Sequence, residues 1–239
     1  MSARSLSKAI LFAITGLLAT GCATTKPYDY TNFRQHRPRS ILVLPPLNNS
    51  TDVRGTYGYF STVTRPLAEM GYYVFPIVIV DQFLKENGLP GPGEMHQAPL
   101  DKFAKIFGTD SVLYITLEQY GTKYHVLNSV TRVAAKASLV DARTGLLLWE
   151  GQAAAEQRPN GGGGGGGGLI GALVQTVVRA VVNQAVNSSV DTAHPVSGEV
   201  NTLMFMGNSS RSFGSSPAVG VGGPPLLYGP YRPEGEPYN

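Results

Sequence analysis

The chain has 239 residues, a formal net charge of +3, only 15% charged residues and one cysteine. This length suits one domain with additional segments at its ends, and a single cysteine excludes a disulfide within the chain. Proteins that bind nucleic acid normally carry clustered lysines and arginines, so the near-neutral charge predicts no nucleic-acid partner.

Residues 1–21 have the features of a secretory signal peptide. Arg4 and Lys8 form a short basic region, and residues 9–18 form an apolar segment that is too short to span a bilayer as a mature helix. Removal of residues 1–21 would take away these two cations and lower the formal charge of the remaining chain from +3 to +1.

Cys22 follows the apolar segment directly after Gly21. The run ATGC at 19–22 resembles the lipobox of bacterial lipoproteins, in which the cysteine is acylated through sulfur and becomes the mature N-terminus. The run departs from the family's pattern at Ala19, where leucine is the commonest residue. The resemblance implies lipidation at Cys22, and several acyl chains form an effectively permanent anchor. The alternative interpretation is a lone apolar cysteine at the end of an ordinary signal peptide or an N-terminal helix.

The residue after the cysteine carries information about location. Ala23 is similar to the second residue of lipoproteins that are sorted to the outer membrane, which implies attachment to the periplasmic face of that membrane. Residues 22–38 are predicted to form a lipidated, flexible tether. Arg34, Arg37 and Arg39, in this tether and directly after it, are expected to face water or lipid headgroups.

The first half of the following region alternates between strand and helix patterns. Residues 41–44 form a continuous apolar run, which is typical of a strand buried on both faces. Pro66 indicates that its helix begins late or is kinked. The alternation predicts parallel strand pairing in an α/β layer. The expected elements are strands at 41–44 and 72–77, helices at 56–70, 80–87 and 100–107, and a loop at 89–99.

The second half changes to alternating apolar and polar residues, with the two-residue period of half-buried strands. Residues 111–120 and 130–140 show this period, and residues 146–155 return after a turn at 141–145 as the antiparallel partner of the second strand. The predicted fold class is therefore α/β (α+β), with a mixed sheet, N-terminal strand–helix units, an antiparallel hairpin and a late amphipathic helix.

The remaining segments are assigned from composition and period. Residues 159–168 contain eight consecutive glycines without the Gly-Lys-Ser/Thr of a phosphate-binding loop, so they are predicted to form a hinge within a single α/β domain at 39–206. Residues 169–190 are predicted to form the late amphipathic helix, and a further helix is expected at 196–206. Residues 207–239 are rich in proline, glycine and tyrosine and are predicted to be disordered, either as a docking segment or as a solvated tail.

The order of these segments resembles that of a known family. The lipobox, the segment ILVLPPLNNSTDVRGTYGY, the segment YYVFPI, the segment VDARTGLLLWEG and the late helix, in this order, are similar to outer-membrane lipoproteins of the neisserial genome-derived-antigen type, whose function is unknown. The resemblance covers about residues 20–206. It implies a fold similar to the N-terminal domain of the Tol-system periplasmic protein and to the curli secretion lipoprotein. It also implies a part in an envelope export or assembly complex.

No catalytic motif is apparent, so we predict that the chain is not an enzyme and needs no cofactor. The histidines lack the spacing of a metal site, and a nucleophile elbow is absent. The polar loop Asn48, Asn49, Ser50 and Asp52 follows the first strand and is the candidate binding site, because α/β sheets often bind ligands there. The same residue types also serve in loops that only turn the chain.

Two functions are consistent with these features. The first is a structural or accessory lipoprotein that contacts another envelope lipoprotein or a secretion component. The second is a ligand-binding lipoprotein that recognises cell-wall polymer or regulates a wall synthase. The first is favoured, because the sequence shows no cluster of aromatic residues of the kind that binds carbohydrate.

Overall fold

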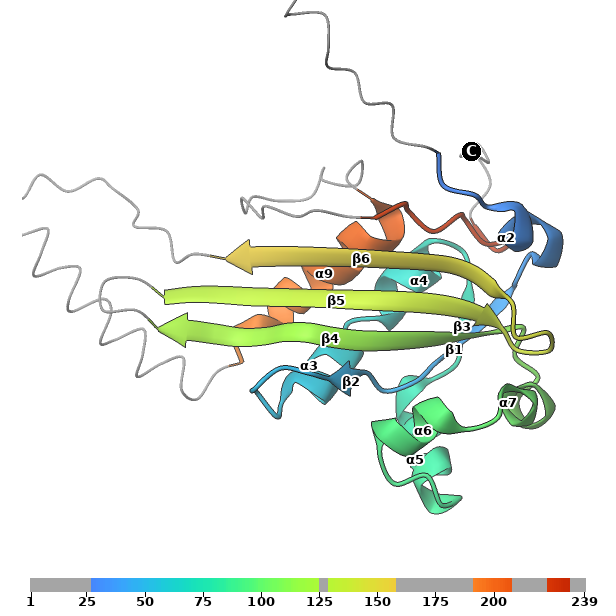
Figure 1. Cartoon of the computed structure of the whole chain (residues 1–239), viewed down its shortest axis with the longest axis horizontal. Helices are drawn as coiled ribbons and strands as arrows, with labels where there is room; N and C mark the ends of the chain where they lie inside the picture. The colour runs from blue at the N-terminus through green and yellow to red at the C-terminus, as the bar shows by residue number, and fades with distance from the viewer. Residues whose placement is uncertain (1–26, 125–128, 158–190, 208–222, 233–239) are drawn as a thin grey trace, which may run out of the picture.

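The computed structural model describes residues 27–124, 129–157, 191–207 and 223–232. Within these residues it contains a six-stranded mixed sheet in the order β3-β1-β4-β5-β6, with β2 beside β4 (Figure 1). The strands are β1 (Ser40–Val43), β2 (Leu47–Asn48), β3 (Tyr73–Val74), β4 (Ser111–Tyr124), β5 (Ser129–Asp141) and β6 (Leu147–Gln157).

Both parallel and antiparallel pairings occur in the sheet, which confirms the predicted fold class. β1 pairs in parallel with β3 and β4, and β2 also pairs in parallel with β4. The long strands β4, β5 and β6 form an antiparallel meander, in which Leu113 lies opposite Leu139 and Leu139 lies opposite Trp149. The parallel pairs therefore belong to the strand–helix half of the chain and the antiparallel pairs to the half with a two-residue period.

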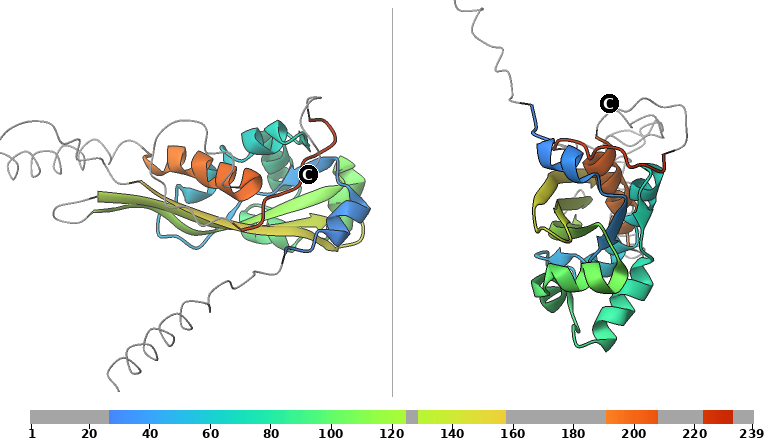
Figure 2. Two further views of the ribbon diagram at one scale, coloured as in Figure 1. Left: turned by 90° about the horizontal axis from the view of Figure 1, so that it is seen from above. Right: turned by 90° about the vertical axis from the view of Figure 1, so that its right-hand side faces the viewer.

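Helices lie on both faces of this sheet. Helices α3, α4 and α9 cover one face, and α5, α6 and α7 pack on the other face beside β1 and β4 (Figures 1 and 2). The helices are α2 (Thr31–His36), α3 (Gly55–Phe60), α4 (Thr64–Glu69), α5 (Ile77–Glu86), α6 (Pro92–Gln97), α7 (Leu100–Phe107) and α9 (Ala193–Met206).

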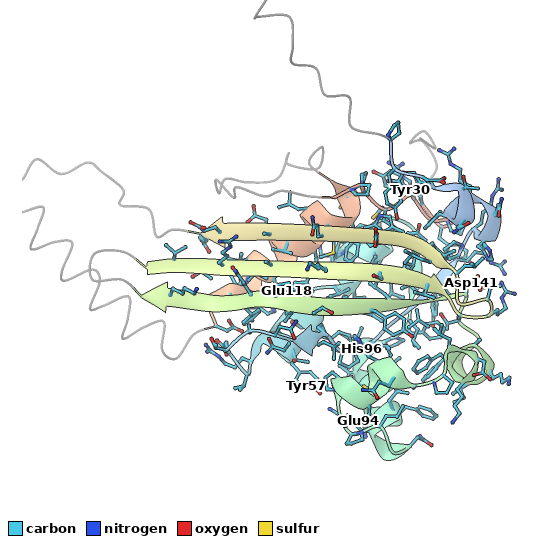
Figure 3. The ribbon with its side chains drawn as sticks, in the orientation of Figure 1. Tyr30, Tyr57, Glu94, His96, Glu118 and Asp141 are labelled. Carbon is cyan, nitrogen blue, oxygen red and sulfur yellow. The ribbon has the colours of Figure 1, made fainter. Side chains whose placement is uncertain are left out.

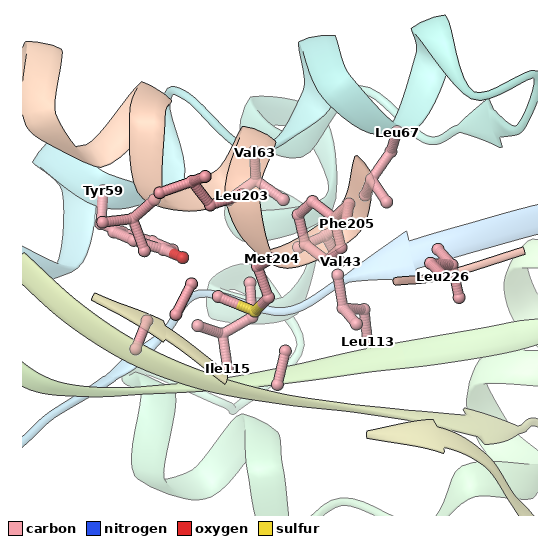
Figure 4. Packing of buried hydrophobic residues seen from close by; sticks show 14 of the residues in the cluster. Val43, Tyr59, Val63, Leu67, Leu113, Ile115, Leu203, Met204, Phe205 and Leu226 are labelled. Carbon is pink, nitrogen blue, oxygen red and sulfur yellow. The ribbon is translucent and has the colours of Figure 1, made fainter. Parts of the chain in front are cut away.

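The buried apolar side chains form two clusters that are separated by the sheet. β1 and the residue after it supply both clusters: Ile41 and Val43 belong to the cluster under α3, α4 and α9, whereas Leu42 and Leu44 belong to the cluster under α5–α7. Figure 4 shows the larger cluster, in which Met204 of α9 lies above the sheet. The prediction that this strand is buried on both faces is confirmed.

Some predicted helices differ from those in the structure. The helix expected at 56–70 is two helices, α3 and α4, and Pro66 lies in the first turn of α4, where its missing N–H group is not needed. The expected loop at 89–99 contains α6, with Pro92 at its start and Met95 fully buried. The glycines and prolines of this stretch suggested a loop, but a proline at the first position is compatible with a helix.

The strand expected at 72–77 is also shorter in the structure. β3 comprises only Tyr73–Val74, and α5 begins at Ile77, three residues before the predicted helix start at residue 80. Val78 and Ile79 are 69% and 63% exposed, so the first turn of α5 has apolar residues on its outer surface. These exposed apolar residues obscured the helical period at the start of the element.

The prediction of a flexible tether is wrong for residues 27–38. The short helix α2 buries Phe33, which is only 5% exposed, and Tyr28 and Tyr30 pack against the same apolar cluster. The Glu150 backbone N–H donates to the Tyr28 hydroxyl at 3.0 Å, and Asn32 Nδ2 donates to a β6 carbonyl at 3.2 Å. This segment is therefore attached along the edge of β6. Cys22 lies outside the described residues.

The prediction of a disordered tail is wrong for residues 223–232, which we call the C-terminal strap. The Trp149 indole N–H donates to the Pro224 carbonyl at 2.9 Å, and the Leu226 N–H donates to the Phe205 carbonyl at 2.8 Å. Leu226 is only 2% exposed. Prolines and glycines prevent regular structure here but leave enough backbone groups and apolar contacts to hold an extended segment.

Other predicted elements lie partly or wholly outside the described residues. The glycine hinge at 159–168 and the amphipathic helix at 169–190 belong to this group. The helix expected at 196–206 is present as α9, which begins three residues earlier at Ala193. Within the described ranges, the helices are all too short or too polar to cross a bilayer.

Candidate binding hollow at the end of β4

The predicted polar loop follows β2, and Asn48 organises it from within. Asn48 Nδ2 donates to the Asp52 carbonyl at 2.8 Å. Its side-chain oxygen accepts from the Ser50 backbone N–H at 2.9 Å and from the Ser50 hydroxyl at 2.6 Å. Such contacts are those of an Asx turn, in which the side chain replaces a backbone partner. Asn48 therefore shapes the loop.

Asp52 and Arg54 form the charged tip of this loop. Arg54 donates through its backbone N–H and Nε to Asp52 Oδ1, both at 3.0 Å, and through Nη2 to Oδ2 at 2.7 Å. The hydrogen bond from the guanidinium lowers the pKa of Asp52, so the carboxylate is ionised at neutral pH. The pair presents one negative and one positive group side by side.

The loop forms one wall of an open hollow with a volume of about 870 Å³. The other walls come from the far end of β4, the neighbouring ends of β5 and β6, and the start of α9. The lining residues are Asn49, Ser50, Thr51, Asp52, Val53, Arg54, Glu118, Gln119, Tyr120, Gly121, Thr122, Lys123, Val130, Arg132, Glu156, Asp191, Thr192 and Ala193.

Tyr120 lies at the base of this hollow, and its hydroxyl donates to Asp191 Oδ2 at 2.5 Å. The other oxygen of Asp191 accepts from the Ala193 N–H at 3.1 Å, which fixes the first turn of α9 to β4. Burial and the hydrogen bond to Asp191 both raise the pKa of Tyr120, so the phenol stays protonated at neutral pH. Gly58 of α3 leaves the room for this contact, because a Cβ there would lie 2.1 Å from the Tyr120 oxygen.

A bulge in β4 explains why Tyr120 points inward. The register with β5 shifts between Leu117 and Gln119, so strict alternation is interrupted at Glu118. Leu117 and Tyr120 are consequently both buried although they are three residues apart. Glu118 faces outward on the sheet, where its carboxylate pairs with Lys136 at 3.1 Å (Figure 3).

The hollow carries charges of both signs and several hydroxyl groups. Arg132 lies opposite Glu156 in the β5–β6 register. The hydroxyl of Thr122 lies 2.7 Å from those of Thr131 and Thr192, which ties β4, β5 and the start of α9 together. Such a surface is suited to hydrogen bonds and ion pairs with a polar partner.

The structure brings together three of the four predicted site residues. Asn49, Ser50 and Asp52 line the hollow, whereas Asn48 holds the loop. The residues that the sequence did not indicate come from β4, β5, β6 and the start of α9. Only the sheet register brings these distant segments to the loop, so the sequence pattern contains no local signal for them.

The described histidines are separate from one another. His36 Nδ1 contacts Asp141 at 2.9 Å, His96 Nε2 contacts the Pro45 carbonyl at 2.9 Å, and His194 Nε2 contacts the Ser61 hydroxyl at 3.0 Å. Burial lowers the pKa of His96. Among the described residues, no group of three or more histidine, cysteine or carboxylate side chains is arranged to hold a metal ion.

Comparisons with known proteins identify relatives of this chain. A curated protein of Neisseria meningitidis serogroup B, "Putative lipoprotein NMB1124/NMB1162", is 45% identical over 163 residues, which is 68% of this chain and 74% of the relative. The crystal structure of lipoprotein GNA1162 from Neisseria meningitidis is 48% identical and covers 63% of this chain and 99% of that one, with a TM-score of 0.49. A PelC dodecamer from Paraburkholderia phytofirmans is 14% identical and covers 70% and 85% of the two chains, with a TM-score of 0.40.

The family model described as "Putative lipoprotein GNA1162-like" matches residues 28–217. This match includes the β1 strand, the polar loop, the meander and α9, and it agrees with the resemblance seen in the order of the sequence segments. The chain therefore belongs to the GNA1162-like lipoprotein family.

Proposed function

We propose that this chain is an outer-membrane lipoprotein that is anchored through Cys22, faces the periplasm and serves as a non-enzymatic accessory or structural subunit of an envelope secretion or assembly complex. Membership of a lipoprotein family supports the anchor. The docked N-terminal segment supports a structural role, because few residues separate it from Cys22, the proposed site of lipidation.

The attachment of residues 27–38 to the domain is the observation that carries this proposal. Tyr28 already contacts β6, so only residues 23–26 separate Cys22 from the docked segment. Covalent geometry limits the distance from Cys22 to residue 27 to roughly 17 Å. A domain held this close to the bilayer suits a subunit of a membrane-bound assembly better than a binding domain that samples the periplasm on a long linker.

The chemistry of the hollow supports a binding role. Asp52 is paired with Arg54, and the carboxylate of Asp191 is held by Tyr120 and the start of α9. A general base or nucleophile needs a free, suitably tuned group beside a substrate. The paired groups of the hollow instead offer fixed donors and acceptors to a protein surface.

The anchor is tested by the substitution Cys22→Ser. We expect the variant to remain unprocessed and to incorporate no labelled fatty acid, because the acylated sulfur is absent. Normal processing of the variant would show that Cys22 is not the acceptor.

The accessory role is tested by affinity purification of the mature lipoprotein from detergent-solubilised envelopes. We expect a second envelope lipoprotein or a secretion component in near-stoichiometric amount. The double variant Lys123→Ala/Arg132→Ala, which removes two exposed cations from the hollow, should reduce its recovery. The control variant Arg65→Ala, on the exposed surface of α4, should not. Purification of the unmodified chain without a stoichiometric partner would contradict the proposal.

The second candidate function, recognition of cell-wall polymer or regulation of a wall synthase, is favoured by the hollow itself. Its volume of about 870 Å³ falls within the range of ligand sites, about 300–1,000 Å³. Titration of the mature protein with soluble cell-wall glycan fragments, followed by calorimetry, tests this function. Saturable binding that is lost in Lys123→Ala/Arg132→Ala would favour it over the accessory role.

A further inference from the structure

We infer that the end of the molecule formed by α2 and the β5–β6 turn lies directly on the anionic lipid headgroups of the membrane that holds the anchor. This surface, which we call the basic end, consists of the exposed side chains Arg34, Arg37, Arg39, Arg143, Leu146 and Leu147. The inference rests on the proposed anchoring through Cys22.

Contacts within the structure place these arginines together. Arg37 Nε donates to the Arg34 carbonyl at 3.2 Å. Arg39 and Arg143 lie on either side of Asp110, each with a guanidinium nitrogen 3.9 Å from one of its oxygens. Segments that are about 100 residues apart in the chain therefore contribute cations to one surface.

Two acidic groups at this end, Asp141 and Asp110, have largely covered side chains. Asp141 has a side chain that is only 3% exposed, and it accepts hydrogen bonds from Thr144 while contacting His36 (Figure 3). Asp110 accepts from the backbone of β1 through Ser40. Asp29, which is exposed, precedes α2 and lies at the other end of that helix from Arg37. Asp29 and Glu150 are exposed near Tyr28, but the four exposed arginines outnumber them, and the side chains of Arg39 and Arg143 are both 68% exposed.

Apolar side chains lie beside these cations. Leu146 and Leu147, at the turn into β6, are 45% and 43% exposed. Asn32 of α2 donates to the Leu147 carbonyl, so the helix and the turn are in direct contact. Cations next to exposed leucines are the combination that binds the interface of an anionic membrane.

The position of the anchor selects this end. The docked segment leads from residue 27 directly into α2, and Cys22 lies within roughly 17 Å of residue 27. The hollow lies at the opposite end of β4, because Ser111 pairs with Asp141 at the basic end whereas Gly121 lies beside Asp52. The ten residue steps from Ser111 to Gly121 span roughly 33 Å at the rise of a strand. The membrane contact thus directs the hollow away from the bilayer.

The test uses the mature lipoprotein in vesicles. Cys22 is the single cysteine of the sequence. With that sulfur acylated, a new cysteine is a unique labelling site. One variant carries a fluorophore at Gln35→Cys, on α2, and the other carries it at Val53→Cys, which is 89% exposed at the hollow. Vesicles of phosphatidylethanolamine and phosphatidylglycerol contain a lipid with a spin label on its headgroup as the quencher.

We expect strong quenching at position 35 and little at position 53. In each labelled protein, the double substitution Arg34→Gln/Arg143→Gln should shift the domain away from the membrane. The ratio of domains that contact the membrane to domains that do not should fall by about five-fold per arginine. The matched double variant Lys123→Gln/Arg132→Gln removes the same charge from the hollow and should leave quenching at position 35 unchanged. Replacement of phosphatidylglycerol by a zwitterionic lipid should weaken quenching as the arginine variant does.

Two results would overturn the inference. Equal quenching at positions 35 and 53, or quenching at position 35 that does not respond to the arginine variant, would show that the basic end does not face the lipid. Mass spectrometry of the N-terminal peptide separates this failure from that of the anchor. An unacylated Cys22 would overturn the proposed anchoring and the inference together, whereas an acylated Cys22 with uniform quenching would overturn only the inference.

Discussion

At the scale of single residues, the contact between Tyr120 and Asp191 depends on the absence of a side chain at Gly58. A methyl group at position 58 would lie 2.1 Å from the Tyr120 hydroxyl oxygen, so one of the two groups must move. We predict that Gly58→Ala lowers the free energy of unfolding of the mature protein by about 1–3 kcal/mol. Chemical denaturation followed by circular dichroism measures this change.

Two further variants make this prediction specific. Tyr120→Phe in the Gly58→Ala background removes the clashing oxygen and should recover part of the loss. Gly198→Ala is the control, because its added methyl meets no atom within 4 Å in α9 and should stabilise the helix by about 0.5–1 kcal/mol. Equal effects of Gly58→Ala and Gly198→Ala would show that the close approach has no energetic consequence.

Asp141 makes stability depend on pH. Burial raises the pKa of Asp141, but hydrogen bonds to the carboxylate lower it by a larger amount, so the net shift is downward. These bonds come from the backbone and hydroxyl of Thr144, from the Arg143 N–H and from His36. A lowered pKa in the folded state contributes stability that is present above about pH 4, the unfolded pKa, and is lost as the pH falls through the folded value.

We therefore predict that the free energy of unfolding falls as the pH drops below about 4, and that Asp141→Asn weakens this dependence. Urea denaturation at pH 7 and at several values below 4 measures both slopes. The result that would refute a role for Asp141 is an acid slope that is the same in Asp141→Asn as in the unmodified protein.

At the scale of elements, α2 behaves as part of the domain and not as a tether. Phe33 is buried, so Phe33→Ala should cost about 3 kcal/mol of unfolding free energy. Gln35→Ala, on the exposed side of the same helix, should change it by less than about 0.5 kcal/mol. If the two variants had the same stability, α2 would not be docked in solution.

The C-terminal strap covers Trp149, which is the single tryptophan of the chain. Truncation after residue 207 removes the strap and should shift the emission of Trp149 to longer wavelength, because the fully buried indole loses its hydrogen bond to the Pro224 carbonyl. Truncation after residue 232 keeps the strap and should leave the emission unchanged. An unshifted spectrum in the shorter chain would exclude the strap as the cover of Trp149.

The elements also show what a sequence pattern can predict. The residues with a two-residue period, Leu113, Ile115 and Leu117, are all fully buried, so β4 and its face were predictable. The hollow was predictable only at its loop, because the bulge at Glu118 changes which residues face inward. Pattern analysis also failed for 27–38 and for the strap, since both are held by isolated contacts, such as those of Phe33 and Leu226, and lack a repeating period.

At the scale of the whole molecule, the two segments that flank the domain meet on the same edge. The Tyr30 hydroxyl donates to the Pro225 carbonyl at 2.5 Å, so residues from both ends of the chain lie beside β6. The docked segment and the basic end lie at one end of β4, while the hollow lies at the other. This arrangement would leave the hollow accessible to a periplasmic partner.

The proposed function and the proposed membrane contact both depend on acylation of Cys22, so the most direct measurement is the mass of the N-terminal peptide of the mature protein, purified from the membrane fraction. We predict a chain that begins at Cys22 and carries acyl chains on that residue. A chain that retains residues 1–21, or one that begins elsewhere with a free thiol at Cys22, would contradict this prediction.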